Sequence, residues 1–252
     1  MAYDAILFDL FDTLVRFDRD RLPAVQVDGR VVRSTVGQLH PILATVAPVV
    51  TLEALYRALL ASWQEAERRR AIDHREVAAA ERFAHLFQYL GLDAEACPRE
   101  VMQALLDAHR RGLSGAAEFP AHHGPLLADL AGRFRLAVVS NFDYTPTAVG
   151  ILEAAGVAPL FDTIVVSDAV GWRKPAPAIF QAALTRLGLA PRQALFVGDR
   201  ADIDVLGAHG VGMHAAWLNP DGAALPPGVA RPEYELRDLE DLRGILSLGS
   251  GV

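Results

Sequence analysis

The 252-residue chain has few of the features that mark secreted, membrane-spanning or metal-thiolate proteins. Its single cysteine, Cys97, excludes an intramolecular disulfide and any metal site built from several thiolates. Because no stretch of about 18 apolar residues is free of charge, we expect no membrane span. The apolar N-terminal segment carries Asp4, Asp9 and Asp12, whereas a signal peptide has a basic start and an uncharged core. These absences predict a cytoplasmic protein.

Positive charge is also scarce. The chain has 24 Lys and Arg residues against 31 Asp and Glu residues, a formal net charge of −7, and no basic tail, so we expect no nucleic-acid partner. It has no glycine-rich phosphate loop, so nothing favours ATP use through such a loop. By contrast, 52% of the residues are hydrophobic, which is enough for a substantial core and excludes general disorder.

Short apolar runs that end in a polar or small residue recur along the chain. They occur at 5–8, 136–139, 163–166, 194–197 and 214–218. Uncharged runs of this length are typical of parallel strands covered by helices on both faces. Helical patterns at 124–130, 147–155 and 178–187 lie between them, and a strand at 234–236 and a helix at 239–246 follow. The alternation predicts an α/β fold with a doubly wound parallel sheet.

One long segment interrupts that alternation. Between 16 and 118 the patterns predict helices at 52–72, 76–90 and 99–111, with a hairpin at 25–35 around Asp28-Gly29. We expect Trp63 and Phe83 in the core of this segment, and Arg68–Arg70 on a solvated helix face. The prediction is therefore a core domain at 1–15 and 119–252 with an inserted helical domain at 16–118.

Polar residues gather where the predicted strands end. Because the carboxyl ends of parallel strands meet at one edge of a sheet, we expect these side chains to form a ligand-binding crevice. Three carboxylates there repel one another unless a cation compensates them, and hard oxygen ligands favour Mg²⁺. Three aspartates, one lysine and one dication sum to zero charge. The residues are Asp9, Ser140, Asn141, Lys174, Asp199 and Asp204.

Four short motifs carry these residues in order: DLFDTLV at 9–15, Ser140-Asn141, Lys174-Pro175 and GDRADID at 198–204. Together they resemble the four motifs of the haloacid dehalogenase (HAD) superfamily. The helical insertion just after the first motif is similar to the cap domain of its first subfamily. The resemblance covers essentially the whole chain, and it implies an enzyme, a HAD-like hydrolase.

The resemblance implies a role for each matching position. Asp9 would be the nucleophile that forms an aspartyl intermediate, and Thr13 would orient its carboxylate. Ser140 and Lys174 would hold the phosphoryl oxygens, with Asn141 completing the catalytic set. Mg²⁺ would bind Asp9, the Phe11 carbonyl, Asp199 and Asp204, although Asp204 would equally suit a role in anchoring its loop. The implied substrate is a small anionic molecule, a phosphate monoester.

Phe11 departs from the pattern of the family's phosphatases, which generally carry an aspartate there as general acid and base. The Phe11 carbonyl can still bind a metal, but its side chain cannot transfer protons. Alkyl phosphates, whose leaving groups need a proton, should suffer most. Asp12 follows directly, and in an extended backbone its side chain would point away from Asp9, whereas a distorted loop would bring it closer.

Phe11 keeps two alternatives open. Dehalogenases of the family also lack that aspartate and release halide without a proton, so the chain could be a metal-independent 2-haloacid dehalogenase. They typically lack the Gly-Asp of the last motif, and without a metal the three aspartates and one lysine leave a net charge of −2, which disfavours a carboxylate substrate. The other alternative is a catalytically weak protein that binds phosphate esters. The His122-His123 pair is interpreted as a helix-start feature rather than a metal site.

Overall fold

A computed structural model describes residues 3–248 of the chain. The chain divides into two compact units, one formed by Met1–Arg16 with Phe119–Val252 and the other by Phe17–Glu118. A two-stranded sheet of β2 (Arg16–Phe17) and β5 (Ala117–Glu118) occurs where the chain passes from one unit to the other. Within 3–248, every helix is too short or too polar to cross a bilayer.

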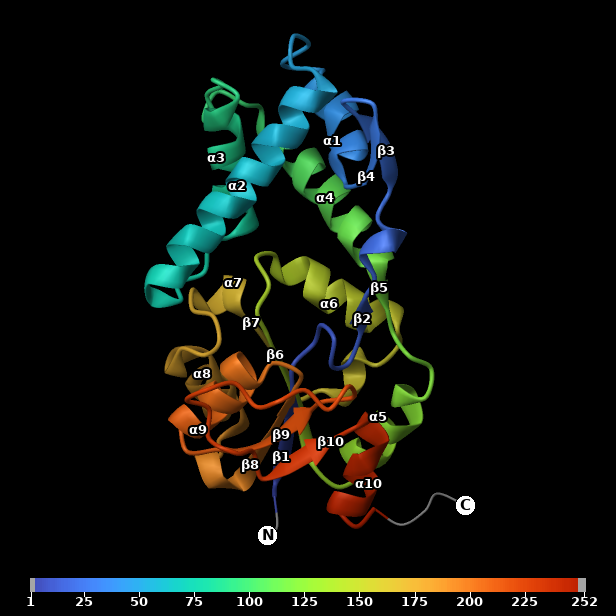
Figure 1. Cartoon of the computed structure of the whole chain (residues 1–252), viewed down its shortest axis with the longest axis vertical. Coiled ribbons are helices and arrows are strands. Elements are labelled where there is room, and N and C mark those ends of the chain that lie inside the picture. Colours follow the sequence, from blue (N-terminus) through green and yellow to red (C-terminus); the bar gives the residue numbers. More distant parts are fainter. Residues whose placement is uncertain (1–2, 249–252) are drawn as a thin grey trace. The chain divides into compact units, whose positions relative to one another are not determined.

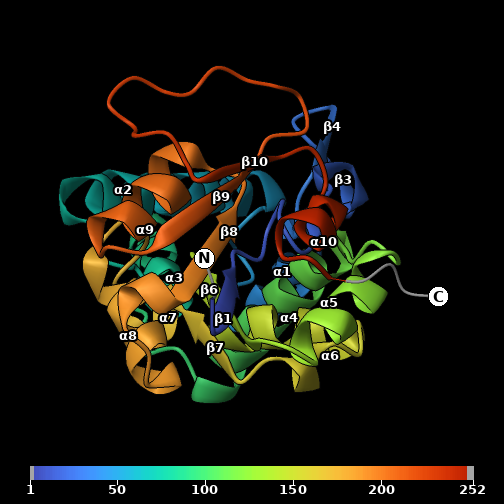
Figure 2. The same ribbon diagram turned by 90° about the horizontal axis from the view of Figure 1, so that it is seen from below.

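The first unit contains a six-stranded parallel sheet (Figures 1 and 2). Its order is β10-β9-β8-β1-β6-β7, so β1 lies between β6 and β8 at the centre. The bounds are β1 (Ala5–Phe8), β6 (Arg135–Ser140), β7 (Thr163–Val166), β8 (Ala194–Gly198), β9 (His214–Leu218) and β10 (Tyr234–Leu236). The predicted α/β fold with a parallel sheet is confirmed, and each predicted strand is present.

Helices cover both faces of this sheet, which explains why its strands are apolar on both sides (Figure 2). On one face, alternate residues such as Leu7 and Phe196 pack against Phe180 of α8 (Pro177–Leu187) and against α9 (Leu206–Gly210). The other face carries α5 (His123–Ala131), α6 (Thr145–Ala154) and α10 (Leu242–Ile245). A short α7 (Ser167–Val170) follows β7.

The second unit is mainly helical. Its helices are α1 (Val36–Leu43), α2 (Leu52–Asp73), α3 (Ala79–Tyr89) and α4 (Arg99–Ala116). Strands β3 (Ala24–Val27) and β4 (Arg30–Arg33) pair as an antiparallel hairpin, and both Asp28 and Gly29 of its turn have positive φ, as tight hairpin turns require. Helix α1 was not predicted, because Pro41 inside it and its eight-residue length weaken the helical pattern.

Two expectations for α2 are wrong. Trp63 is 50% exposed rather than part of the core, whereas Phe83 of α3 is buried as expected. Arg70 is buried rather than solvated, and it forms ion pairs with Glu67 at 2.6 Å and Glu76 at 2.7 Å. The helical period assigned these positions to the wrong faces because α2 packs mainly against α3, and that packing direction is not encoded in a single helix's pattern.

Candidate active site

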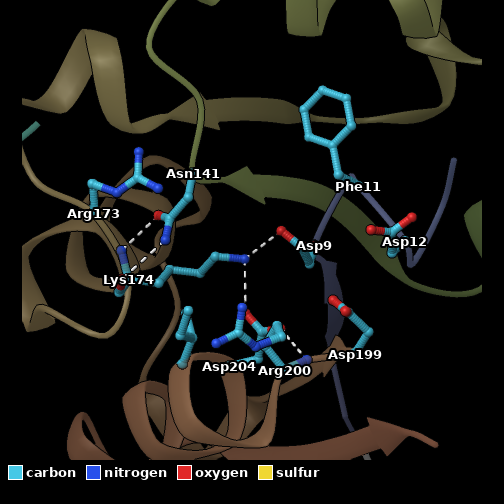
Figure 3. Close-up of a pocket in the computed structure, with 10 residues that line it drawn as sticks. Asp9, Phe11, Asp12, Asn141, Arg173, Lys174, Asp199, Arg200 and Asp204 are labelled. Carbon is cyan, nitrogen blue, oxygen red and sulfur yellow. Dashed lines mark hydrogen bonds and ion pairs between the residues drawn. The ribbon is translucent and has the colours of Figure 1, made fainter. Parts of the chain in front are cut away.

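The candidate site lies at the carboxyl edge of the parallel sheet (Figure 3). Asp9 follows β1, Ser140 is the last residue of β6, and Asp199 follows β8. Since β6, β1 and β8 are neighbours in the sheet, these three residues are brought together although they are far apart in sequence. The backbone N–H of Asp9 donates to the Val197 carbonyl at 2.9 Å, which fixes the start of the loop after β1.

Lys174 is the central cation of the site. Its side chain is almost fully buried, and its Nζ donates to Asp9 Oδ1 and lies 2.8 Å from Asp204 Oδ1. The ring of Phe196 lies 5.1 Å from the ammonium on its remaining side. Burial disfavours the charged ammonium, but the carboxylates of Asp204 and Asp9 outweigh burial and raise the pKa of Lys174 above its usual value. Lys174 is therefore held as a cation between two carboxylates.

Asn141 holds the backbone of Lys174 in place. Its Nδ2 donates to the Lys174 carbonyl at 2.9 Å, and its Oδ1 accepts from the Lys174 N–H at 2.7 Å. Both polar ends of the amide are thus engaged with the loop that carries the lysine. Asn141 also lines the pocket, and its catalytic role stays a prediction.

The carboxylates of the site are under-compensated. Burial raises the pKa of Asp9 to about 6, against the opposing effect of Lys174 and with a further increase from Asp204. Burial likewise raises the pKa of Asp199 to about 7, and the neighbouring carboxylates of Asp9 and Asp204 add to it. When all three carboxyls are ionised, they and the Lys174 ammonium carry a net charge of −2.

Thr13 contacts a different carboxylate from the one expected. Its hydroxyl donates to Asp199 Oδ1 at 3.4 Å, whereas Lys174 supplies the side-chain bond to Asp9. Trp217 Nε1 donates to the backbone carbonyl of Asp199 at 2.8 Å. The Thr13 hydroxyl is therefore bonded to Asp199, and the role of Thr13 in orienting the Asp9 carboxylate stays a prediction.

Asp204 is buried at the end of a π-helical turn, Ala201–Val205. Its Oδ2 accepts from the backbone N–H of Arg200 at 3.0 Å, while its Oδ1 pairs with Lys174. A Cβ on Gly198 would collide with the Asp204 carboxylate, so only glycine at the end of β8 leaves room for it. Asp204 therefore both anchors the loop after β8 and reaches the charged centre.

The donor set fits a hard divalent cation. Asp9, Asp199 and Asp204 each offer one carboxylate oxygen, and these oxygens all lie within 4.8 Å of one another. Burial, with the neighbouring carboxylates adding to it, raises the pKa of two of these carboxyls, and a bound dication would favour their ionised forms. Oxygen ligands of this kind suit Mg²⁺ better than a softer metal.

Ser140 offers an unused donor at the end of β6, the strand beside β1, although it is not one of the residues that line the pocket. It is completely buried, and its Oγ has no hydrogen-bond partner among residues 3–248. A buried hydroxyl without a partner is costly, so its presence at the sheet edge fits a ligand with acceptor oxygens. A phosphoryl group has such oxygens.

The loop after Asp9 has the distorted one of the two conformations that the sequence left open. Asp12 has φ = 61°, the left-handed region, and its N–H donates to the Val15 carbonyl at 2.6 Å. This turn makes Asp12 line the same pocket as Asp9 rather than point away from it, because the backbone is not extended here. Phe11 also lines the pocket, and its ring packs on Phe142 with centroids 4.9 Å apart.

The pocket, of about 220 Å³, has lining residues that the sequence analysis did not single out. They are Arg173, Arg200 and Ile203. The two arginines are adjacent in sequence to Lys174 and Asp199, which is the signal that could have identified them. His122 lies outside the pocket, 3.6 Å from Asp238, and His123 is buried with Nδ1 2.9 Å from the Leu14 carbonyl. The histidine pair is thus structural, as expected.

The buried aspartate–lysine centre lies at the carboxyl edge of a parallel sheet, which is where α/β proteins of this kind bind their ligands. The family model of the haloacid dehalogenase-like hydrolases matches residues 3–212. The chain therefore belongs to the haloacid dehalogenase-like hydrolase family, and it is a hydrolase. The expected family is confirmed.

Curated relatives include proteins of different stated activity. YfnB of Bacillus subtilis, a HAD-hydrolase by its name, is 28% identical over 173 residues, which cover 68% of this chain and 70% of that protein. The pyrimidine 5′-nucleotidase YjjG of Escherichia coli is 33% identical over 122 residues, covering 48% of this chain and 53% of that enzyme. The chain thus spans about half the length of the nucleotidase.

Solved structures share the fold over nearly the whole chain. The structure of YfnB bound to magnesium has a TM-score of 0.62 with 23% identity, covering 98% of this chain and 100% of that chain. A 2-haloacid dehalogenase from Pseudomonas syringae has a TM-score of 0.70 with 24% identity, covering 99% and 100%. At this level of identity the similarity shows only the fold. The reaction that the protein catalyses has to be inferred from the residues of its site.

Proposed function

We propose that this protein is a Mg²⁺-dependent phosphatase of small phosphate monoesters that works through an aspartyl-phosphate intermediate on Asp9. The observations that carry the proposal are the under-compensated cluster of Asp9, Asp199 and Asp204 and the buried, unpartnered Ser140 hydroxyl at the end of the neighbouring strand β6. The first element calls for a dication and the second for acceptor oxygens. A metal-bound phosphate ester supplies both.

In the proposed reaction Asp9 is the nucleophile. Its carboxylate attacks phosphorus, the bond to the ester oxygen breaks, and water later releases phosphate from the aspartyl-phosphate. Lys174 pairs with Asp9 and places positive charge where the phosphoryl oxygens would bind. Ser140 donates its hydroxyl to one of those oxygens, and Asn141 keeps the Lys174 loop in position.

Mg²⁺ would be held by Asp9, Asp199, the Phe11 carbonyl and Asp204, with Asp204 also anchoring its loop. When bound, it neutralises the carboxylates and stabilises charge on the phosphoryl oxygens. The nucleotidase activity of YjjG is consistent with a phosphorylated substrate. We further propose that the helical unit is the cap domain that selects the substrate.

The test is the initial rate of p-nitrophenyl phosphate hydrolysis by the purified protein, with Mg²⁺ and with EDTA. We expect a rate that requires Mg²⁺ and is lost in Asp9→Asn. His122→Ala is the matched control and should retain the rate, because His122 lies outside the pocket. A rate that survives Asp9→Asn would contradict the proposal, as would the absence of any Mg²⁺-dependent rate.

Metal-independent 2-haloacid dehalogenation is the second candidate, and the apolar side chain of Phe11 in the pocket is the observation that favours it. Halide leaves without a proton, so such a reaction would not need an acid there. The net charge of −2 on Asp9, Asp199, Asp204 and Lys174 opposes it, because a carboxylate substrate would be repelled. Chloride release from a 2-chloro acid in EDTA would establish this reaction and refute the first.

A further inference from the structure

Phe11 forms one wall of the pocket, on the side opposite Asp199 and Asp204. Figure 3 shows the ring extending from the chain just after Asp9, away from Asp199 and Asp204. The ring is half-buried, lines the pocket, and packs on Phe142 with an interplanar angle of 33°. This wall of the pocket is therefore aromatic and has no proton to donate.

The polar groups that line the pocket are mostly committed elsewhere. Lys174 is paired with Asp9 and Asp204, and Asp204 also accepts from the Arg200 backbone. The Asp199 carboxylate accepts from Thr13, and the Arg200 guanidinium is paired with Asp202. Arginine does not give up a proton in proteins, so the guanidiniums are not general acids. Asp12 is the one further carboxylate among the pocket residues of the described chain.

We propose that the site acts on phosphate esters and anhydrides whose leaving group is stable as an anion, namely those of phenols, enols and carboxylic acids, and discriminates against alkyl phosphates. The inference deepens the proposed phosphatase function and rests on it. It stands on two facts about Phe11: its side chain carries no transferable proton, and its ring is an apolar part of the pocket lining, packed on the ring of Phe142.

The chemical step needs no proton for such substrates. An Asp9 oxygen forms a bond to phosphorus, the bond from phosphorus to the leaving oxygen breaks, and the electron pair remains on that oxygen, which departs as a phenolate, enolate or carboxylate. Water then attacks phosphorus, the bond to Asp9 breaks, and both hydrogens stay on the released dihydrogen phosphate. An alkoxide is far more basic, and without a general acid its departure is slower by about 10²–10⁴-fold.

Four substrates distinguish the effect of leaving-group acidity on the rate from the effect of an aromatic ring that contacts the pocket. Phenyl phosphate and benzyl phosphate both carry a ring, but the first releases a phenol of pKa about 10 and the second an alcohol. Acetyl phosphate and glycerol phosphate carry no ring and differ in the same way. With the full-length protein and Mg²⁺, we expect kcat/KM for phenyl to exceed that for benzyl by about 10²-fold or more, and for acetyl to exceed glycerol similarly.

Two variants at one position give a matched pair. Phe11→Asp supplies a proton donor, and it should lower the phenyl-to-benzyl ratio by about tenfold or more. Phe11→Leu supplies neither proton nor ring; it should keep that ratio and raise KM for phenyl phosphate by about two- to tenfold through lost ring contact. If Phe11→Asp fails to fold, the wild-type ratios and Asp12→Asn still decide the matter.

The outcomes distinguish the inference from the function on which it rests. Turnover of all four esters with a phenyl-to-benzyl ratio near one overturns the inference and leaves the phosphatase proposal intact. A small ratio that grows in Asp12→Asn also overturns it, because Asp12 would then be the proton donor. No Mg²⁺-dependent turnover of any of the four overturns both. A large ratio in the wild type that is unchanged in Asp12→Asn supports the inference.

Discussion

The two units of the molecule treat buried charge in opposite ways. In the helical unit, buried Arg70 contacts two carboxylates and the Val77 carbonyl, and buried Arg82 lies 2.8 Å from His109 Nε2. In the α/β unit, Lys174 faces Asp9 and Asp204 at once, and Asp199 adds a third carboxylate nearby.

This difference suggests that the buried charges of the helical unit stabilise the fold, whereas those of the α/β unit take part in a reaction. Each terminal nitrogen of Arg70 has a carboxylate partner, and such pairing is how a buried ion is made tolerable in a stable structure. The α/β site instead keeps a deficit of two positive charges and an unpartnered hydroxyl at Ser140. Uncompensated carboxylates and a buried hydroxyl without a hydrogen bond both cost stability. They indicate a ligand that supplies the missing positive charge and the missing hydrogen-bond acceptor.

The largest predicted effect is the loss of activity when the proposed nucleophile of the α/β site is removed. Asp9→Asn should lower kcat for p-nitrophenyl phosphate by about 10⁴-fold or more, because the covalent step is lost as a whole. The fold should not suffer, since the change removes one of three mutually repelling carboxylates. Activity would be followed at saturating Mg²⁺, with urea unfolding as the stability check. A variant that loses activity only by unfolding would break the comparison.

In the helical unit, where the buried arginine is paired with carboxylates, the largest effect of a substitution should be on stability. Arg70→Met leaves Glu76, whose side chain is 1% exposed, without its cation and should lower the free energy of unfolding by about 3–5 kcal/mol. Arg68→Met is the matched control on the same helix, because its pair with Glu65 is exposed and worth about 0–1 kcal/mol. Equal losses in the two variants, measured in urea, would show that burial does not set the difference.

Much of the α/β unit could be predicted from the sequence. Buried parallel strands are recorded as short apolar runs, and the residues that end them carry the charges of the site, so the positions of Asp9 and Asp199 at the sheet edge follow from the pattern alone. The roles assigned to them remain predictions. Helix faces were less predictable: the period of α2 marked Trp63 as core and Arg70 as solvated, and both are the reverse.

The details of the site depended on backbone geometry that no pattern records. Asp12 reaches the pocket because its φ is positive, a conformation that non-glycine residues seldom adopt. The Thr13 hydroxyl donates to Asp199 Oδ1, a partner 186 positions away in the sequence. Contacts of this kind depend on tertiary structure, which local propensity does not determine.

Metal binding offers an intermediate test of the deficit. At Mg²⁺ concentrations near 100 times Kd, the free energy of unfolding should rise by about 2.7 kcal/mol, since the ion binds the folded cluster and not the unfolded chain. Asp199→Asn should remove most of this increase. Asp202→Asn is the control, because Asp202 is exposed and paired with Arg200 outside the cluster. An increase that persists in Asp199→Asn would place the ion elsewhere.

The smallest predicted effect is on the pH dependence of the free energy of unfolding, measured in EDTA, where no metal compensates the carboxylates of the site. The pKa of Asp199 is about 7 and that of Asp9 about 6 in the folded protein, against about 3.9 for an unfolded aspartate. Between pH 4 and 7 the folded state therefore binds more protons than the unfolded state. The free energy of unfolding from these groups must then fall as pH rises, the reverse of the usual carboxylate contribution.

One proton of difference corresponds to about 1.4 kcal/mol per pH unit, so the Asp199 carboxyl alone should give a fall of about 2 kcal/mol between pH 5 and 7. Asp199→Asn should flatten the curve. Asp202→Asn should not, because its bond to Arg200 lowers the pKa of Asp202 and acts below this range. Saturating Mg²⁺ should oppose the fall by favouring the ionised carboxylates. A wild-type curve that rises from pH 5 to 7 in EDTA would mean that Lys174 alone balances the cluster, and the contrast with Arg70 would then disappear.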